Sequence, residues 1–160
     1  YKRQVIENCD TDLVVFLDSD CTFDPTYISE MLNFLDPDVD IVNGSPYHPE
    51  GDIEGVKKGR LLISNTANAF YKLLVDKNIH TYTSIFKMYR TSKIRNIILE
   101  TKGFVAVTEL FVKCILNGAN VKEFPCILKI RKFGDSKIHI LNSTKNHLLF
   151  MNKLIFKNTL

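Results

Sequence analysis

Two carboxylates placed two positions apart, Asp18 and Asp20, follow a short apolar run at residues 13–17. An uninterrupted apolar run of this length is typical of a parallel strand that is buried on both faces. Ligands of open α/β sheets bind beyond the carboxyl ends of such strands. Hard oxygen ligands there suit Mg²⁺ or Mn²⁺ bound together with a substrate diphosphate. For an isolated Asp-x-Asp, a solvated loop without a metal is the commoner outcome, so the rest of the chain must decide.

A polar stripe and a basic loop are two further features of the chain. Arg60, Ser64 and Asn68 are spaced four apart within a predicted helix, so they share one face of it. For a helix taken alone, a solvent-facing stripe is the simpler interpretation. The basic loop at residues 131–137 follows a predicted strand and contains a glycine.

The elements that must position these groups alternate between strand and helix, as in an α/β fold. Asp24 is a good N-cap and Pro25 a good first helical residue. Glu109 falls in the first turn of another helix, where the helix dipole favours a carboxylate whatever its function. Residues 47–59 lack periodicity and predict a mobile loop that could act as a lid. We expect strands near residues 13–17, 40–43, 83–89 and 121–130, and helices near 25–35, 58–75, 92–99, 107–117 and 144–160.

Composition describes an ordinary globular domain, with 45% hydrophobic and 24% charged residues among 160. A net charge of +3 without a basic, aromatic-rich stripe gives no support for nucleic-acid binding. The four cysteines lack metal-ligand spacing and are expected to be reduced thiols of an intracellular protein, three of them packed as small apolar residues. No segment has the pattern of a signal peptide or a membrane span. The first residue is Tyr1 and a strand follows almost at once, so we expect a fragment whose beginning is missing.

Five motifs in order cover most of the chain from residue 11 to residue 137, and each is weak alone. Together they resemble family-2 glycosyltransferases of the GT-A fold, especially the dolichol-phosphate mannose synthase-like branch that acts on polyprenyl phosphates. The motifs are Asp18-Ser-Asp20 with Asp24-Pro25; Asn43-Gly44-Ser45; Arg60-x-x-x-Ser64; Gly103-Phe104 leading to Glu109-Leu110 and Gly118; and Arg131-x-x-Gly134-x-Ser136-Lys137.

The resemblance implies a GT-A, Rossmann-like mixed sheet flanked by helices, of which this chain is the C-terminal part. It implies a metal-dependent, inverting transfer of a hexose from a nucleotide-diphosphate sugar, such as GDP-mannose or a UDP-hexose. Asp18 and Asp20 would bind the Mg²⁺ or Mn²⁺, with Asp20 as the closer and catalytic ligand. Phosphate oxygens of donor or acceptor would be bound by Ser45, Arg60, Ser64, Arg131, Ser136 and Lys137.

The acceptor implied by the resemblance is a polyprenyl phosphate. This nucleophile is already anionic, so it needs cationic positioning more than a general base. Glu109 is expected either to act as a base or to orient the acceptor or a neighbouring cation. We expect residues 1–143 to form the catalytic domain without its nucleotide-binding strands, and the fragment alone to be inactive. Residues 144–160 would form a basic amphipathic helix, packed on the domain or lying on the cytoplasmic face of a membrane.

Departures from the family pattern keep two alternatives open. Thr22 stands where this branch usually has Gln, Pro46 stands where it has Arg, and residues 83–86 depart from its Thr-Ser-Gly-Phe-like stretch. Within the same class, the acceptor could be a glycan hydroxyl. In another class, Asp18-Ser-Asp20-Cys-Thr22 resembles the D-x-D-x-T motif of haloacid-dehalogenase-like phosphatases, with Asp18 as nucleophile and Asp20 as acid/base. The late acidic pair of that family is missing.

Overall fold

The computed structural model describes residues 6, 8–130 and 140–156. Within them the main sheet has the strand order β1-β4-β2-β5. β4 runs antiparallel to both β1 and β2, whereas β5 runs parallel to β2. The carboxyl ends of β1, β2 and β5 therefore share one edge of the sheet, and β4 begins at that edge. The strands are β1 (Leu13–Phe16), β2 (Ile41–Ser45), β4 (Lys87–Arg90) and β5 (Val121–Pro125).

The prediction that the first strand is parallel and buried on both faces is wrong for the described part of the chain. β1 pairs with β4 in antiparallel register, with Phe16 opposite Lys87. Only Val14 of β1 is fully buried, and its other residues are half-buried. The apolar run fixes the strand itself, but it carries no information about the direction of the neighbouring strand. That direction is decided by β4, a segment more than 60 residues further along the chain.

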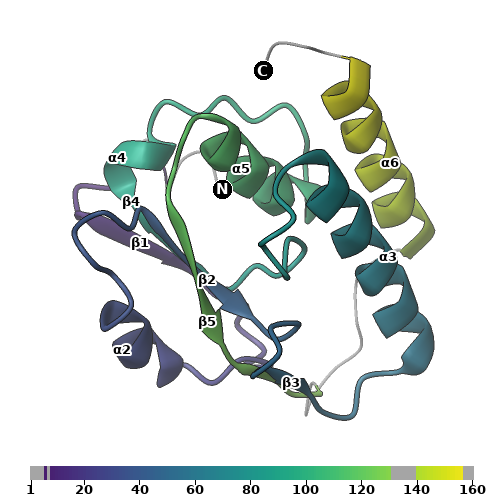
Figure 1. The fold of residues 1–160 in the computed structure, drawn as a ribbon, viewed down its shortest axis with the longest axis horizontal. Coiled ribbons are helices and arrows are strands. Elements are labelled where there is room, and N and C mark those ends of the chain that lie inside the picture. The colour runs from purple at the N-terminus through teal and green to yellow at the C-terminus, as the bar shows by residue number, and fades with distance from the viewer. Residues whose placement is uncertain (1–5, 7, 131–139, 157–160) are drawn as a thin grey trace.

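Helices cover both faces of the sheet (Figure 1). α2 (Tyr27–Leu32) lies on one face, and α5 (Val105–Leu116) lies on the other with α3 (Lys58–Leu74) and α6 (Ile140–Phe156) beyond it. α3 and α6 run side by side. The short α4 (Thr91–Ile94) follows β4 directly. The predicted mixed α/β sheet flanked by helices is confirmed.

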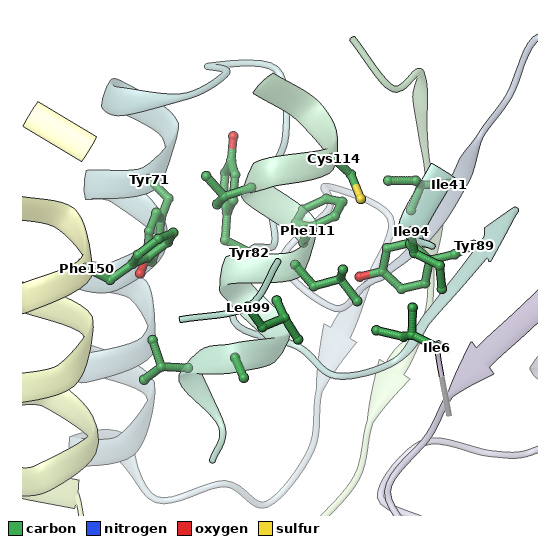
Figure 2. Packing of buried hydrophobic residues seen from close by; sticks show 14 of the residues in the cluster. Ile6, Ile41, Tyr71, Tyr82, Tyr89, Ile94, Leu99, Phe111, Cys114 and Phe150 are labelled. Carbon is green, nitrogen blue, oxygen red and sulfur yellow. The ribbon is translucent and has the colours of Figure 1, made fainter. Parts of the chain in front are cut away.

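Residues that alternate along the strands fill two separate cores, as the two-residue period of a strand requires. One core contains Val42, Met88 and Phe124 beneath α2. The other contains Ile41 and Tyr89 beneath α5, α3 and α6. Figure 2 shows a row of aromatic rings in this second core that links the outer helices to the sheet. Its members are Phe150 of α6, Tyr71 of α3, Tyr82 from the irregular stretch before β4, and Phe111 of α5, with centroids 5.5–6.2 Å apart from one ring to the next.

A second, two-stranded parallel sheet joins β3 (Asp52–Ile53) to β6 (Ile127–Leu128). The loop predicted at residues 47–59 therefore contains a paired strand. The single strand predicted at residues 121–130 is in fact two strands in different sheets, β5 and β6, separated at Cys126. Pro125, which ends β5, has no backbone N–H to continue the hydrogen-bond ladder, and this explains the break.

Several predicted boundaries shift. Asp24 does accept hydrogen bonds from the backbone and hydroxyl of Thr26, at 3.0 and 2.7 Å, but these close a turn, and α2 begins only at Tyr27. α3 matches its prediction to within one residue, and α6 begins at Ile140, before residue 144. Of the cysteines, Cys114 and Cys126 are buried, Cys9 is half-buried and Cys21 is exposed, all as free thiols. No helix within the described ranges is long and apolar enough to cross a membrane.

Candidate active site

The two carboxylates of the acidic motif lie in a tight turn just beyond β1. Asp18 and Asp20 are half-buried, and the backbone N–H of Cys21 donates to the carbonyl of Asp18 at 3.4 Å. Oδ1 of Asp20 accepts from the N–H of Thr22 at 3.2 Å, which fixes the orientation of that carboxylate. Cys21 has a φ of +52°, a conformation that costs a non-glycine residue about 1 kcal/mol. Backbone strain of this kind is typical of functional sites.

The exit of β6 lies beside this acidic turn. The backbone N–H of Lys129 donates to the carbonyl of Thr22 at 2.8 Å, although more than 100 residues separate them in the chain. This hydrogen bond places Lys129, two residues before the predicted basic loop, beside the acidic turn. The three residues predicted to bind phosphate from that loop lie outside the described residues: Arg131, Ser136 and Lys137.

Two of the three predicted phosphate-binding serines, Ser45 and Ser64, contact one irregular segment, residues 80–84, which precedes β4. The hydroxyl of Ser45, at the end of β2, lies 2.7 Å from that of Thr81. The hydroxyl of Ser64, on α3, lies 2.9 Å from that of Thr83. Ser45 is completely buried, whereas Ser64 is half-buried. Ser45 therefore contacts segment 80–84 from the protein interior, and Ser64 contacts it nearer the protein surface.

Segment 80–84 has no regular secondary structure, and polar side chains from several elements hold its backbone. Oδ1 of Asn68, on α3, accepts from the N–H groups of residues 82 and 83 at 2.9 and 3.2 Å. The carboxylate of Glu123, on β5, accepts from the N–H groups of residues 80 and 81 at 2.9 and 3.2 Å. Asn43, on β2, donates its amide to the carbonyl of residue 81 at 2.7 Å. Because buried backbone groups need partners, these side chains take the role that a sheet ladder plays elsewhere.

Lys87, the first residue of β4, completes this support from below. Its ammonium group donates to the carbonyls of Tyr82 and Ser84 and lies 4.7 Å from the ring centroid of Phe111. Burial lowers the pKa of Lys87 to about 7, although the nearby carboxylate of Glu123 opposes the shift. A buried amine therefore lies at the edge of the sheet where β4 begins and where β1, β2 and β5 end.

The polar stripe on α3 becomes progressively more buried along the helix, from Arg60 to Asn68. Arg60 is exposed in the first turn, Ser64 is half-buried, and Asn68 is 4% exposed. The stripe is therefore not uniformly exposed to solvent, so the simpler interpretation made from the sequence is wrong. The stripe points along α3 toward segment 80–84, with its charged member outermost.

Glu109, on α5, is held by groups from the loop that precedes its own helix. Its carboxylate accepts from the backbone N–H groups of Glu100 and Thr101 at 2.8 and 2.7 Å and from the hydroxyl of Thr101 at 2.6 Å. Lys113 lies 2.9 Å away. Burial alone would raise the pKa of Glu109, but the hydrogen bonds from Lys113, from the Thr101 hydroxyl and from the two N–H groups outweigh burial and lower it.

Sequence reasoning missed the residues that join these parts, chiefly Thr81, Thr83 and Tyr47. The N–H of Tyr47 donates to the hydroxyl of Thr81 at 3.3 Å. The sequence signal was the run of hydroxyl-bearing residues at 81–84. Residues 83 and 84 were predicted to begin a strand, but β4 begins only at Lys87.

Among the described residues, no three His, Cys, Asp or Glu side chains form a group that could hold a metal ion by themselves. The donor set that is present consists of the two half-buried carboxylates of Asp18 and Asp20. Hard carboxylate oxygens of this kind fit Mg²⁺ or Mn²⁺ as part of a set that a substrate completes.

Comparisons with known proteins place this geometry in context. The model of the family described as glycosyl transferase family 2 matches residues 2–98, more than half of the chain. Polyprenol monophosphomannose synthase of Mycolicibacterium smegmatis is 31% identical over 129 residues, which cover 79% of this chain and 49% of that protein. Undecaprenyl-phosphate mannosyltransferase of Micrococcus luteus is 25% identical over 130 residues, covering 79% and 53%.

Two solved structures share the fold, both of glucosyl-3-phosphoglycerate synthase from Mycobacterium tuberculosis. One holds Mn²⁺, UDP and glucosyl-3-phosphoglycerate, and the other holds Mn²⁺ and UDP-glucose. Each aligns with 95% of this chain at a TM-score of 0.64 and 11% sequence identity. The chain spans about half the length of the curated relatives and of the solved structures that it matches.

Proposed function

The chain belongs to glycosyltransferase family 2, and we propose that it is part of an enzyme that transfers a hexose from a nucleotide-diphosphate sugar to a polyprenyl phosphate. The likeness to the two solved structures confirms the predicted GT-A fold. The names of both curated relatives support a polyprenyl phosphate acceptor and mannose as the sugar. In this reaction an acceptor phosphate oxygen attacks the anomeric carbon, the bond from that carbon to the diphosphate breaks, and nucleoside diphosphate leaves.

The observation that carries the choice of acceptor is the environment of Glu109. A general base must be able to take up a proton near neutral pH. The four contacts of Glu109 instead hold it as an anion, with its oxygens occupied by residues 100, 101 and 113. An acceptor hydroxyl needs a base, whereas a phosphate is ionised before it arrives. Glu109 therefore serves to orient the loop before α5, and an anionic acceptor suits the site better than a glycan hydroxyl.

Asp18 and Asp20 are the residues that would hold Mg²⁺ or Mn²⁺. When bound, the ion would neutralise charge on the donor's diphosphate as the nucleoside diphosphate departs. The hydrogen bond from Thr22 to Asp20 pre-orients one of the two carboxylates. Mn²⁺ in both solved structures supports a metal for those proteins, and by extension the proposal made for this chain.

The remaining predicted site residues would bind phosphate. Arg60 supplies charge at the outer end of the α3 stripe, and Ser64 supplies a hydroxyl one turn further along. Arg131, Ser136 and Lys137 would approach from the loop after β6, whose start is tied to Thr22. Ser45 acts through Thr81, because its own side chain is buried.

We place the enzyme peripherally at the cytoplasmic face of a membrane, where a lipid acceptor would be met. Large apolar side chains on α6 are exposed, and residues 136–160 contain lysines but no acidic residue. A surface that is both apolar and basic suits anionic lipids. The exposed side chains on α6 are Leu148, Leu149, Ile155 and Phe156.

The experiment uses the full-length protein with Mg²⁺ or Mn²⁺, GDP-mannose or a UDP-hexose, and a short-chain polyprenyl phosphate. We expect a hexosyl phosphopolyprenol by mass spectrometry, and its loss on chelation of the metal or in Asp20→Asn. Transfer to a glycan hydroxyl but not to the lipid would contradict the proposed acceptor. The phosphatase alternative instead requires release of phosphate from an aryl phosphate, and neither the family nor the fold supports it.

A further inference from the structure

His80 and Glu123 form a hydrogen-bonded pair at the start of segment 80–84. Nδ1 of His80 lies 2.6 Å from Oε2 of Glu123, and the two side chains are 31% and 9% exposed. We propose that His80 is a positioning residue for sugar transfer: through Glu123 it fixes the segment that contacts Ser45 and Ser64. This inference rests on the proposed function and adds to it a residue that acts through others.

The imidazole of His80 is the donor in this pair. Oε2 of Glu123 also accepts from the backbone N–H of His80 at 2.9 Å, and Oε1 accepts from the N–H of Thr81 at 3.2 Å and from the amide of Asn43 at 3.0 Å. A carboxylate only accepts hydrogen bonds. Nδ1 of His80 therefore carries the hydrogen that joins the pair, and this N–H is the fourth donor to Glu123.

Glu123 is itself held in place by a row of polar side chains across the main sheet. Asn43 of β2 pairs with Lys87 of β4 on one side and with Glu123 of β5 on the other. Residues directly opposite in a sheet share a face. Asn43 and Lys87 are completely buried, and the bond from Asn43 orients the carboxylate. The sheet thus provides a rigid attachment for the segment, and the side chain of His80 completes it.

The imidazole also joins the segment to the loop that follows β2. The ring of His48, in this loop, meets the ring of His80 edge-on, with centroids 5.3 Å apart and planes at 74°. One residue earlier, the N–H of Tyr47 donates to the hydroxyl of Thr81 at 3.3 Å. Two neighbouring residues of the loop therefore contact two neighbouring residues of the segment. Both parts lie at the edge of the sheet where the candidate site is located.

Partial exposure separates a positioning role from a role in stability. Because the imidazole of His80 is 31% exposed, its removal leaves little buried cavity. The backbone N–H of residue 80 keeps its bond to Glu123 whatever side chain stands there. The losses are the side-chain bond to the carboxylate and the ring contact with His48. A small displacement of site groups is enough to slow a reaction that depends on their alignment.

The test compares His80→Ala, His80→Asn and His80→Gln in the full-length protein with Mg²⁺, GDP-mannose and farnesyl phosphate. Asn places its amide N–H close to the position of Nδ1, whereas Gln places it close to that of Nε2. We expect kcat/KM to fall about tenfold in the Ala and Gln variants, the loss typical of one hydrogen bond to a charged group. His80→Asn should restore the wild-type value.

Melting temperatures and a matched control identify a merely structural effect. The three variants should melt within about 3 °C of the wild type. Lys122→Met changes the neighbouring residue of β5, whose exposed ion pair is with Asp36, and should leave kcat/KM unchanged. Wild-type kcat/KM in His80→Ala would overturn the inference. Equal rescue by Gln and Asn would also overturn it, as would a fall in kcat/KM matched by a large fall in melting temperature.

Hydrogen exchange of the amides at residues 80–84 separates this inference from the proposed function, because it needs no turnover. We expect exchange about tenfold faster in His80→Ala than in the wild type, and unchanged in His80→Asn. If the wild type transfers no sugar, the proposed function fails, and this exchange pattern still supports the positioning role of His80. Unchanged exchange in His80→Ala would overturn that role even in an enzyme that transfers sugar.

Discussion

The carboxylate of Glu109 lies 2.9 Å from the ammonium group of Lys113, one turn further along α5, and these side chains are only 1% and 10% exposed. Lys113 also donates to the carbonyl of Ile98 and lies 3.3 Å from the carboxylate of Glu100. The pair therefore fastens the loop of residues 98–101 to α5. Lys153 of α6 reaches the same Glu100 at 2.6 Å, so the loop also connects α6 to the site.

We expect Lys113→Met to be strongly destabilising. Removing one partner of a buried ion pair leaves an uncompensated charge and costs about 3 kcal/mol. Urea unfolding would measure the loss of free energy. The control is Lys122→Met, which breaks an exposed pair with Asp36 and should cost less than about 1 kcal/mol. Equal losses from the two changes would contradict the buried role of Lys113.

Glu109→Gln should lower the free energy of unfolding at pH 7 by an amount that shrinks in acid. The pKa of Glu109 is lowered in the folded state, so its carboxylate stabilises the fold above its ordinary value of 4.5, and this stability is lost as the pH falls through the lower folded value. Unfolding curves of both proteins between pH 3 and pH 7 test this. A difference that grew as the pH fell would contradict it.

Lys87→Met should change the pH dependence of stability on the alkaline side. Because the pKa of Lys87 falls from 10.5 to about 7 on folding, the wild type loses stability as the pH falls between these values. The slope is at most about 1.4 kcal/mol per pH unit. The Met variant should lack this loss, so its advantage grows toward pH 7 and is constant below. Parallel stability curves from pH 7 to pH 10 would show that Lys87 is not buried as a neutral amine.

Gly44→Ala should destabilise the sheet edge at the site. A Cβ at Gly44 would lie 2.5 Å from the ring of Phe86 and 2.9 Å from its carbonyl oxygen, and such overpacking costs about 1–3 kcal/mol. Gly59→Ala is the matched control, because nothing lies within 4 Å of its added Cβ and the residue is inside α3. The control should be neutral or stabilising by up to about 1 kcal/mol. Thermal unfolding of both variants measures the contrast.

Local signals predicted most of the helices and strands because their causes are local. The apolar spacing of α3 and the position of Gly118, which takes a φ of +79° after α5, are visible in the sequence alone. The antiparallel placement of β4 between β1 and β2 was not predictable, because it depends on contacts between distant segments.

The same distinction applies to the candidate site. The acidic turn could be located from its spacing at the end of an apolar run. The pairing of Ser45 with Thr81 and of Ser64 with Thr83 spans 36 and 19 residues, and no periodic pattern connects them. Segment 80–84 depends on buried side chains from several elements, so its shape follows from the fold and not from its own sequence.

The most direct test of the central claim is a competition between a polyprenyl phosphate and the matching polyprenol, which lacks only the phosphate. Both acceptors are offered at equal concentration to the full-length protein with a nucleotide-diphosphate sugar and Mg²⁺, and the products are counted by mass spectrometry. The environment of Glu109 and the phosphate-binding role proposed for the α3 stripe predict sugar on the phosphate alone. Equal transfer to the alcohol would contradict the account, because a base able to activate a hydroxyl would then have to be present.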